Sequence, residues 1–296
     1  MRLGIDIGGT KIAAGLVTPE GTVRRRAYAP TPAAQGPPAV VRTVVRLARE
    51  LGLDGVTCAG VGTAGVVDPA GRRIAGATDA IRDWTGTPLA QLLEDELDLP
   101  VLVRNDVQAF LAGELAGSPW RTALGVTVGT GIGGALALDG RVVTGVRGTA
   151  GHVGHVPVAE AAGLACTCGA AGHVEAVASG PAMTAAFAAL GGGAELDLRS
   201  VLERARDGDA DAAGVLARGG HALGEALAGV VNVWDPDVVI LGGGVLAAGE
   251  LYLAPLRAAL AAGVLPVLAG VPVLPARLGD DAVLVGAAGA AGQVGG

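Results

Sequence analysis

The chain has 296 residues, of which 51% are hydrophobic, and it carries a formal net charge of −7. This length is enough for one large domain or two ordinary ones. The 21 basic residues form no block against the 28 acidic ones, so binding to nucleic acid through phosphate neutralisation is excluded. The 51 glycines follow no three-residue period, which excludes a collagen-like chain.

Cysteine usage and hydropathy predict a cytoplasmic protein that does not enter a membrane. The three cysteines form no visible disulfide framework, which suits a reducing compartment. The first residues, MRLGIDIGGTK, lack the apolar core of a signal peptide. Residues 258–276 are uncharged and apolar, but prolines and glycines interrupt them and argue against a transmembrane helix.

The first 117 residues predict an α/β domain. Residues 2–7 form a strand-like run that meets a glycine turn and a second apolar run, which predicts a hairpin and a third strand. The sequence then predicts a helix at 36–52, a strand entering a glycine-rich loop at 56–68, a helix at 88–97, a strand at 99–106 and a helix at 107–117. Ligands of such sheets bind beyond the carboxyl ends of the strands, which are predicted at Asp6, Gly62–Gly65 and Asn105–Asp106.

A similar order of elements returns in the second half of the chain. Residues 122–145 again show a strand, a glycine cluster, a second strand and an Asp139-Gly140 hairpin turn. Helices are predicted within 175–233 and a strand at 237–244. The recurrence of strand, glycine turn and strand predicts an internally duplicated fold.

These elements predict two α/β lobes. The smaller lobe comprises residues 1–117 and is joined by a small-residue helix at about 282–296, which covers the first domain. The larger lobe comprises residues 118–281.

A group of soft metal ligands lies in the larger predicted lobe. The ligands fall within nineteen residues of a segment rich in glycine and alanine, and they are His155, Cys166, Cys168 and His173. Thiolates and imidazoles in so compact a group are what a tetrahedral zinc site needs. The alternative is a scatter of buried cysteines and surface histidines. We expect a structural zinc ion, because this segment has few large apolar residues of its own.

Two glycine-rich loops are candidate phosphate-binding sites, because free backbone N–H groups at a strand end form an anion nest. The first comprises Gly8, Gly9, Thr10 and Lys11, and the second contains Gly129, Thr130, Gly131 and Gly133. Neither is a Walker A loop, and the second lies in a hairpin, which disfavours a dinucleotide site. Ordinary turns of a glycine-rich chain remain the alternative for either loop alone.

Two carboxylates lie at the predicted strand tips. Asp6, beside the first glycine loop, is a candidate ligand of a magnesium ion through water. Asp106 can take the proton from a sugar hydroxyl that attacks a γ-phosphate, while Asn105 holds neighbouring hydroxyls. The alternatives are an Asp6 that caps a turn, and an Asn105 or Asp106 that caps the following helix.

Six motifs in order resemble the ROK family of bacterial sugar kinases and repressors. They are DIGGTK (6–11), RNDVQAFLAGE (104–114), VGTGIGG (128–134), AGHVGH (150–155), CTCGAAGHVEAVASG (166–180) and NVWDPDVVILGGG (232–244). The resemblance spans residues 2 to about 292 and implies an actin/hexokinase-type ATPase fold, with a duplicated mixed-sheet core and a cleft between two lobes. It implies transfer of the γ-phosphate of ATP, with magnesium, to the 6-hydroxyl of a hexose.

The resemblance also implies roles for individual residues. Asp106 corresponds to the catalytic base and Asn105 to a sugar ligand, and Gly65 is taken as a further substrate-binding position. Glu175 resembles the second sugar-binding acid of the family, and His155 the residue that contacts sugar and binds zinc. The turn on the adenosine side corresponds to Gly242, Gly243 and Gly244.

Three departures from the family pattern bear on zinc and on the sugar. His173 replaces the usual third zinc cysteine, and Ala80 stands where glucose kinases carry an asparagine. His152 replaces a glutamate that touches the hydroxyls at C1 and C2, and we count it as substrate-binding. The resulting A-G-H-x-G-H pattern occurs in N-acetylmannosamine kinases of the family, so N-acetylmannosamine is the expected substrate. Glucose, or an amino hexose such as kanosamine or glucosamine, is the alternative.

Other classes of function fit less well. Family repressors carry a DNA-binding domain ahead of the DIGGTK motif, which here begins at Asp6, and a silent sugar sensor would be expected to lose Asp106. The phosphoryl donor stays open, because some relatives use polyphosphate. A homodimer is the family habit and is expected here.

Overall fold

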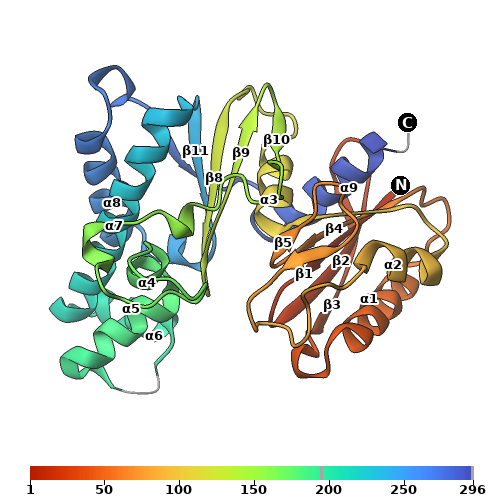
Figure 1. Cartoon of the computed structure of the whole chain (residues 1–296), viewed down its shortest axis with the longest axis horizontal. Helices are drawn as coiled ribbons and strands as arrows, with labels where there is room; N and C mark the ends of the chain where they lie inside the picture. The colour runs from red at the N-terminus through yellow and green to blue at the C-terminus, as the bar shows by residue number, and fades with distance from the viewer. Residues whose placement is uncertain (194–195, 295–296) are drawn as a thin grey trace. The chain divides into compact units, whose positions relative to one another are not determined.

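The computed structural model describes residues 1–193 and 196–294, and its helices and strands gather into two compact units (Figure 1). Unit 1 consists of Met1–Arg121, Leu136–Ala150 and Ala276–Gly296, and unit 2 of Thr122–Ala135 and Gly151–Pro275. The predicted lobes, 1–117 with 282–296 and 118–281, differ from these units mainly because Leu136–Ala150 packs with unit 1. The lobe boundaries stay a prediction.

Unit 1 contains a five-stranded mixed sheet of order β3-β2-β1-β4-β7. Its strands are β1 (Arg2–Ile7), β2 (Lys11–Val17), β3 (Val23–Pro30), β4 (Ala59–Thr63) and β7 (Val101–Asn105). β1 is antiparallel to β2 and parallel to β4, and β4 is parallel to β7. The register therefore brings Ile7, Thr63 and Asn105 side by side at one edge of the sheet.

One face of this sheet is covered by conventional hydrophobic packing. Leu3, Ile5 and Ile7 alternate along β1, and all three are fully buried. They join one core with the apolar faces of α1 (Pro37–Leu51) and α2 (Leu89–Leu97). Val40, Val44 and Leu47 give α1 the helical spacing of an apolar stripe, which is why this segment folds as a helix on the sheet.

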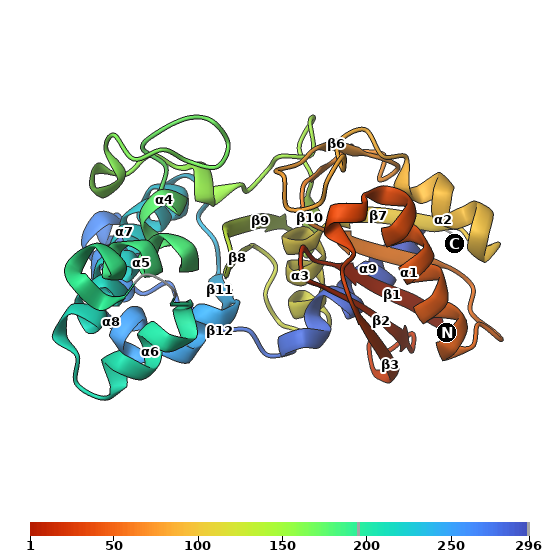
Figure 2. The ribbon, with the colours of Figure 1, turned by 90° about the horizontal axis from the view of Figure 1, so that it is seen from below.

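The opposite face is made of glycines and receives a helix at very short range. Gly4 and Gly60 lie under α9 (Ala282–Val294). In Figure 2, α9 lies on the opposite side of the sheet from α1. A Cβ atom on Gly60 would lie 1.8 Å from the carbonyl oxygen of Ala287, so only glycine allows this approach. The predicted helix at about 282–296 is thus found as far as Val294, and residues 295–296 lie outside the described residues.

The same small-residue packing joins α9 to α3 (Asp106–Leu115). A Cβ atom on Gly286 would lie 1.8 Å from the carbonyl oxygen of Ala109, and one on Gly113 would lie 2.1 Å from that of Ala282. The high glycine content of the chain therefore serves close packing of backbone on backbone, in addition to turns.

A second five-stranded sheet has the order β10-β9-β8-β11-β12. Its strands are β8 (Ala123–Val128), β9 (Ile132–Leu138), β10 (Arg141–Val143), β11 (Val238–Gly242) and β12 (Val273–Pro275). β8 and β11 are parallel, and β9 and β10 form a hairpin. Asp139 and Gly140 have φ values of 52° and 75° between those strands, as the predicted Asp-Gly turn requires.

Helices make up most of the rest of unit 2. They are α4 (Glu175–Ala178), α5 (Gly180–Phe187), α6 (Leu198–Arg206), α7 (Ala210–Trp234) and α8 (Glu250–Gly263). Cβ atoms on Gly220 and Gly224 of α7 would meet the carbonyl oxygens of Tyr252 and Leu256 at 2.3 Å, so glycines again let two helices touch.

Short elements complete the fold. The small hairpin β5 (Val66–Val67) and β6 (Ile74–Gly76) and the helix α8 were not predicted. Single helical turns occur at Ala33–Gln35, Val153–His155, Ala159–Ala161, Ala188–Gly192, Gly244–Ala248, Pro266–Leu268 and Gly279–Asp281. Among the helices of residues 1–193 and 196–294, none is both long and apolar enough to cross a membrane.

Candidate functional site

The predicted strand tips of unit 1 meet around Asn105. Asn105 is buried, and its amide nitrogen donates to the carbonyl oxygen of Gly65 at 3.0 Å and to Oδ1 of Asp106 at 2.9 Å. Its Oδ1 accepts the backbone N–H groups of Val107 and Gln108 and so caps α3. The structure therefore shows Asn105 as the residue that positions Asp106, and its predicted contact with sugar stays a prediction.

Asp106 is the first residue of α3, and only one of its carboxylate oxygens takes part in these local bonds. Oδ1 accepts from Asn105 and from the N–H of Val107, each at 2.9 Å. Burial raises the pKa of Asp106 above its usual range, while these two donors oppose the rise. The hydrogen bonds of the cap use Oδ1, and the raised pKa makes this carboxylate a stronger base than that of an exposed aspartate.

Asp6 is electrostatically coupled to Asp106. Burial raises the pKa of Asp6 to about 7, with the charge of Asp106 as the next cause and Lys11 opposing. A bound cation would stabilise the ionised form of a carboxyl group whose ionisation is opposed by burial and by a second carboxylate. Oxygen donors suit Mg²⁺, so the donor set at Asp6 fits the predicted ion.

The first glycine turn joins β1 to β2. The N–H of Gly8 donates to the carbonyl oxygen of Lys11 at 3.0 Å, and Thr31 Oγ1 donates to the carbonyl oxygen of Gly8 at 2.7 Å. Lys11 Nζ forms an exposed ion pair with Asp280 at 3.2 Å and lies 5.2 Å from the ring centroid of Tyr28. Asp280 lies 269 residues further along the chain, and no sequence pattern signalled this partner.

Gly65 has a backbone reason to be glycine. Its φ is 99°, and a Cβ atom there would lie 2.8 Å from the carbonyl oxygen of Gly76. Because its carbonyl holds Asn105, Gly65 acts on the site through its backbone.

The four predicted metal ligands of unit 2 come together. The ligand atoms of His155, Cys166, Cys168 and His173 all lie within 4.8 Å of one another. Cys166 Sγ is 3.6 Å from His155 Nδ1, and Cys168 Sγ is 3.3 Å from His173 Nδ1. A tetrahedral zinc ion would separate sulfur and nitrogen ligands by about 3.5 Å. The donor set and its spacing therefore fit zinc.

Local backbone pairing holds this cluster. Isolated bridges join Pro157 to His173 and Ala165 to Ala171, so both ends of the loop are closed by short pairings. Burial raises the pKa of the Cys166 thiol, and a bound metal ion would oppose this rise and favour the thiolate.

Glu175 links the metal-ligand cluster to the second glycine loop. Its Oε2 accepts the N–H of Ile132 at 2.8 Å, and its Oε1 accepts the hydroxyl of Thr167 at 2.7 Å. A Cβ atom on Gly131 would lie 2.7 Å from Oε2, so a larger residue at this position would push this carboxylate aside. Thr167, between the two cysteines, was not predicted as part of the site, because a lone threonine carries no pattern.

The second glycine loop and the Gly242–Gly244 turn share one edge of the second sheet. Gly242 pairs with Thr127 across the parallel strands β11 and β8, which places both following turns at the carboxyl ends of these strands. Gly243 has φ 92°, and a Cβ atom there would lie 2.3 Å from the carbonyl oxygen of Val128. Two predicted nucleotide-binding segments therefore lie next to each other at this edge: the loop that contains Gly129, Thr130, Gly131 and Gly133, and the turn Gly242, Gly243 and Gly244.

His152 lies next to the metal-ligand cluster. Its ring stacks on that of His155 with centroids 6.3 Å apart, and the ring of His155 meets that of His173 edge-on at 5.2 Å. The partly buried His152 therefore lies beside a predicted zinc ligand, and its contact with sugar stays a prediction.

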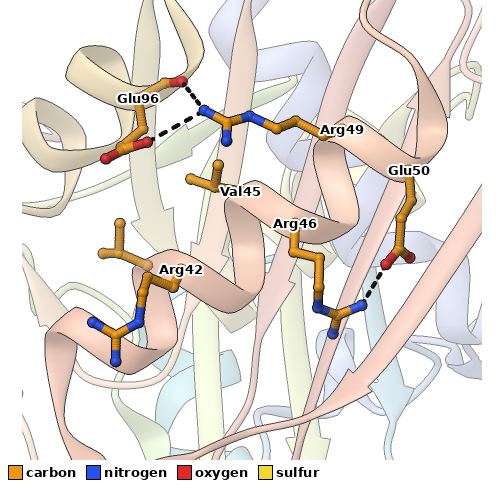
Figure 3. A pocket seen from close by; sticks show the side chains of 7 residues that line it. Arg42, Val45, Arg46, Arg49, Glu50 and Glu96 are labelled. Carbon is orange, nitrogen blue, oxygen red and sulfur yellow. Dashed lines mark hydrogen bonds and ion pairs between the residues drawn. The ribbon is translucent and has the colours of Figure 1, made fainter.

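A separate groove lies over α1 and α2 and shares no residue with these clusters (Figure 3). Arg46 and Arg49, which line it, form ion pairs with Glu50 and Glu96 at 2.5 Å and 3.3 Å. Such exposed ion pairs contribute little to stability and do not by themselves define a binding site.

Comparisons with known proteins match this geometry. Residues 2–293 match the ROK family. The chain is 32% identical to a glucokinase from Thermotoga maritima, over 97% of this chain and 95% of the relative. It is 37% identical to an N-acetylmannosamine kinase from Escherichia coli, over 97% and 96%. Its structure is similar to that of a ROK family glucokinase from Streptomyces griseus in complex with glucose and AMPPNP, with a TM-score of 0.84, 33% identity and 99% of each chain covered.

The fold and these matches define a sugar kinase, as the sequence predicted. The chain belongs to the ROK family. The predicted α/β fold of actin/hexokinase type is confirmed by the likeness to the solved kinase over its whole length.

Proposed function

We propose that this sugar kinase transfers the γ-phosphate of ATP to the 6-hydroxyl of a hexose or hexosamine, and that N-acetylmannosamine is its preferred substrate. The observation that carries the proposal is Asp106, held at the start of α3 by Asn105 and Val107 with one carboxylate oxygen outside that cap. The relatives named glucokinase and N-acetylmannosamine kinase support a hexose or hexosamine as acceptor.

Asp106 is the proposed general base. Its Oδ2 accepts the proton of the 6-hydroxyl as that oxygen attacks phosphorus, and burial keeps the carboxylate basic enough for this role. Asn105 and the backbone of Gly65 keep the carboxylate in position. Backbone N–H groups of the loops at Gly8–Lys11 and Gly129–Gly134 hold phosphate oxygens. Magnesium near Asp6, when bound, neutralises charge on the phosphates.

The proposed sugar ligands of unit 2 are Glu175, His155 and His152. Glu175 is held by Ile132 and Thr167, so its carboxylate is oriented before sugar arrives. A structural zinc ion on His155, Cys166, Cys168 and His173 would fix the ring of His155 in the same way. His152 offers an imidazole in place of a carboxylate at the C1–C2 end of the sugar, which favours a substrate with a bulky N-acetyl group there over glucose.

A coupled ADP-release assay tests the proposal with glucose, mannose, N-acetylmannosamine, N-acetylglucosamine, glucosamine and kanosamine. The highest kcat/KM is expected for N-acetylmannosamine. His152→Glu restores the common family residue and is expected to raise the preference for glucose relative to N-acetylmannosamine. A wild type that prefers glucose, with no change of preference in His152→Glu, would contradict the proposed substrate and leave the kinase reaction standing.

The role of Asp106 is tested in the same assay. Asp106→Asn is expected to lower kcat by about 100-fold to 10,000-fold, with sugar binding retained, because the proton acceptor is lost while the cap can still form. Asp54→Asn makes the same carboxyl-to-amide change at an exposed position and serves as the control. Turnover of Asp106→Asn near that of the control would remove Asp106 from the mechanism.

A further inference from the structure

An imidazole and two carboxylates that are not among the residues of the proposed sugar and zinc sites converge in unit 2. His221 and Glu225 lie one turn apart on α7, and Glu160 lies in the single helical turn Ala159–Ala161. His221 Nε2 is 3.6 Å from Glu160 Oε1 and 3.5 Å from Glu225 Oε1. The ligand atoms of all three residues lie within 4.8 Å of one another.

These separations match one metal coordination sphere. A tetrahedral ion bound about 2.0 to 2.1 Å from nitrogen and oxygen would hold two such ligands about 3.4 Å apart. One imidazole with two carboxylates is a set that first-row transition ions such as Zn²⁺ accept. Because His221 and Glu225 are about half exposed, at 48% and 43%, water can reach an ion held there and complete its coordination.

A second observation concerns Glu160. Its Oε2 is sealed from solvent and has no hydrogen-bond partner among the described residues. A carboxylate oxygen in that state loses its hydration without compensation. The carbonyl of the same residue accepts from Arg218 Nη2 at 3.2 Å, which ties the turn to α7 and limits how far Glu160 can move to relieve it.

We propose that Glu160, His221 and Glu225 bind a divalent first-row transition metal ion, distinct from the zinc site of Cys166 and Cys168. The ion compensates the carboxylate of Glu160, whose Oε2 is sealed from solvent, and holds the two acidic groups together. It also joins α7 to the turn that carries Glu160. In the chain, this turn lies between the zinc-ligand candidates His155 and Cys166. The second ion therefore braces the loop of the first site against α7.

The test is metal binding to the full chain. Wild type, His221→Ala and Glu225→Gln are dialysed against buffered Zn²⁺ and analysed for metal, with Asp211→Asn, an exposed carboxylate of α7, as the matched control. Wild type and the control are expected to bind one ion per chain more than either His221→Ala or Glu225→Gln. Equal metal content in all four proteins would overturn the proposal.

Substitution of Co²⁺ for zinc separates the two sites spectroscopically. Co²⁺ on Cys166 and Cys168 gives thiolate charge-transfer absorption, whereas Co²⁺ on nitrogen and oxygen ligands gives only weak visible bands. His221→Ala is expected to lose the visible contribution of one ion and to retain the charge-transfer band. If His221→Ala loses the charge-transfer band and no other, the missing ion belongs to the cysteine site and the proposal fails. Glu225→Gln keeps the shape of the side chain and provides the same readout where the alanine variant does not fold.

Discussion

Replacing Asp6 by asparagine should stabilise the chain, in the absence of metal and nucleotide, by an amount that grows with pH. The pKa of Asp6 rises from 3.8 to about 7 on folding, first because of burial and next because of Asp106. Between about pH 4 and pH 7 the folded chain holds a proton on Asp6 that the unfolded chain has released. Folding stability therefore falls as pH rises through this window, and the loss is complete above it.

The magnitude follows from the size of the shift. About three pKa units at about 1.4 kcal/mol each correspond to about 4 kcal/mol at pH 8. At pH 5 the solution is only about one pH unit above the pKa of Asp6 in the unfolded chain. The same relation then gives a loss of folding stability of about 2 kcal/mol. Asparagine carries no titratable proton, so the gain in stability of Asp6→Asn should increase by about 2 to 3 kcal/mol between these pH values.

Urea unfolding in metal-free buffer at pH 5 and pH 8 measures this difference. Asp54→Asn, which removes an exposed carboxylate from unit 1, should show no comparable pH-dependent gain. A gain for Asp6→Asn that is the same at both pH values would refute the reasoning, because it would mean that folding does not raise the pKa of Asp6. Addition of Mg²⁺ and nucleotide should reduce the gain, since a bound cation stabilises the ionised carboxylate.

Two further predictions concern packing and zinc. In urea unfolding, Gly60→Ala should destabilise the chain by about 1 to 3 kcal/mol or more, because its Cβ would lie 1.8 Å from the carbonyl oxygen of Ala287. Gly76→Ala is the control and should be nearly neutral, because a Cβ at that position meets nothing within 4 Å. Equal unfolding midpoints of the two variants would contradict the close packing of α9. Cys166→Ser with Cys168→Ser should lose about one zinc ion per chain and lower the Tm, as measured by metal analysis and calorimetry. Zinc content equal to that of wild type would exclude the two thiolates as ligands.

The sequence predicted the order of elements well where the pattern is local. The hairpin after Ile7, the helix ending near Gly52 and the Asp139-Gly140 turn depend on residues close in the chain, and each is found. The group at His155, Cys166, Cys168 and His173 was also predictable, because nineteen residues of one loop contain all four ligands. The ordered motifs identified the family because six of them follow one another along the chain, which shared residue types alone would not produce.

Tertiary structure decided what depends on segments far apart in the chain. No local pattern shows that the carbonyl of Ala287 rests on Gly60, that Lys11 pairs with Asp280, or that the N–H of Ile132 orients Glu175. The same holds for Glu160, whose approach to His221 and Glu225 depends on how a loop packs against α7. The sequence alone thus determined which side chains are available for the proposed phosphate, sugar and metal sites. The pKa of Asp6 and the orientation of Asp106 were decided by folding, because burial and hydrogen-bond geometry exist only in the packed chain.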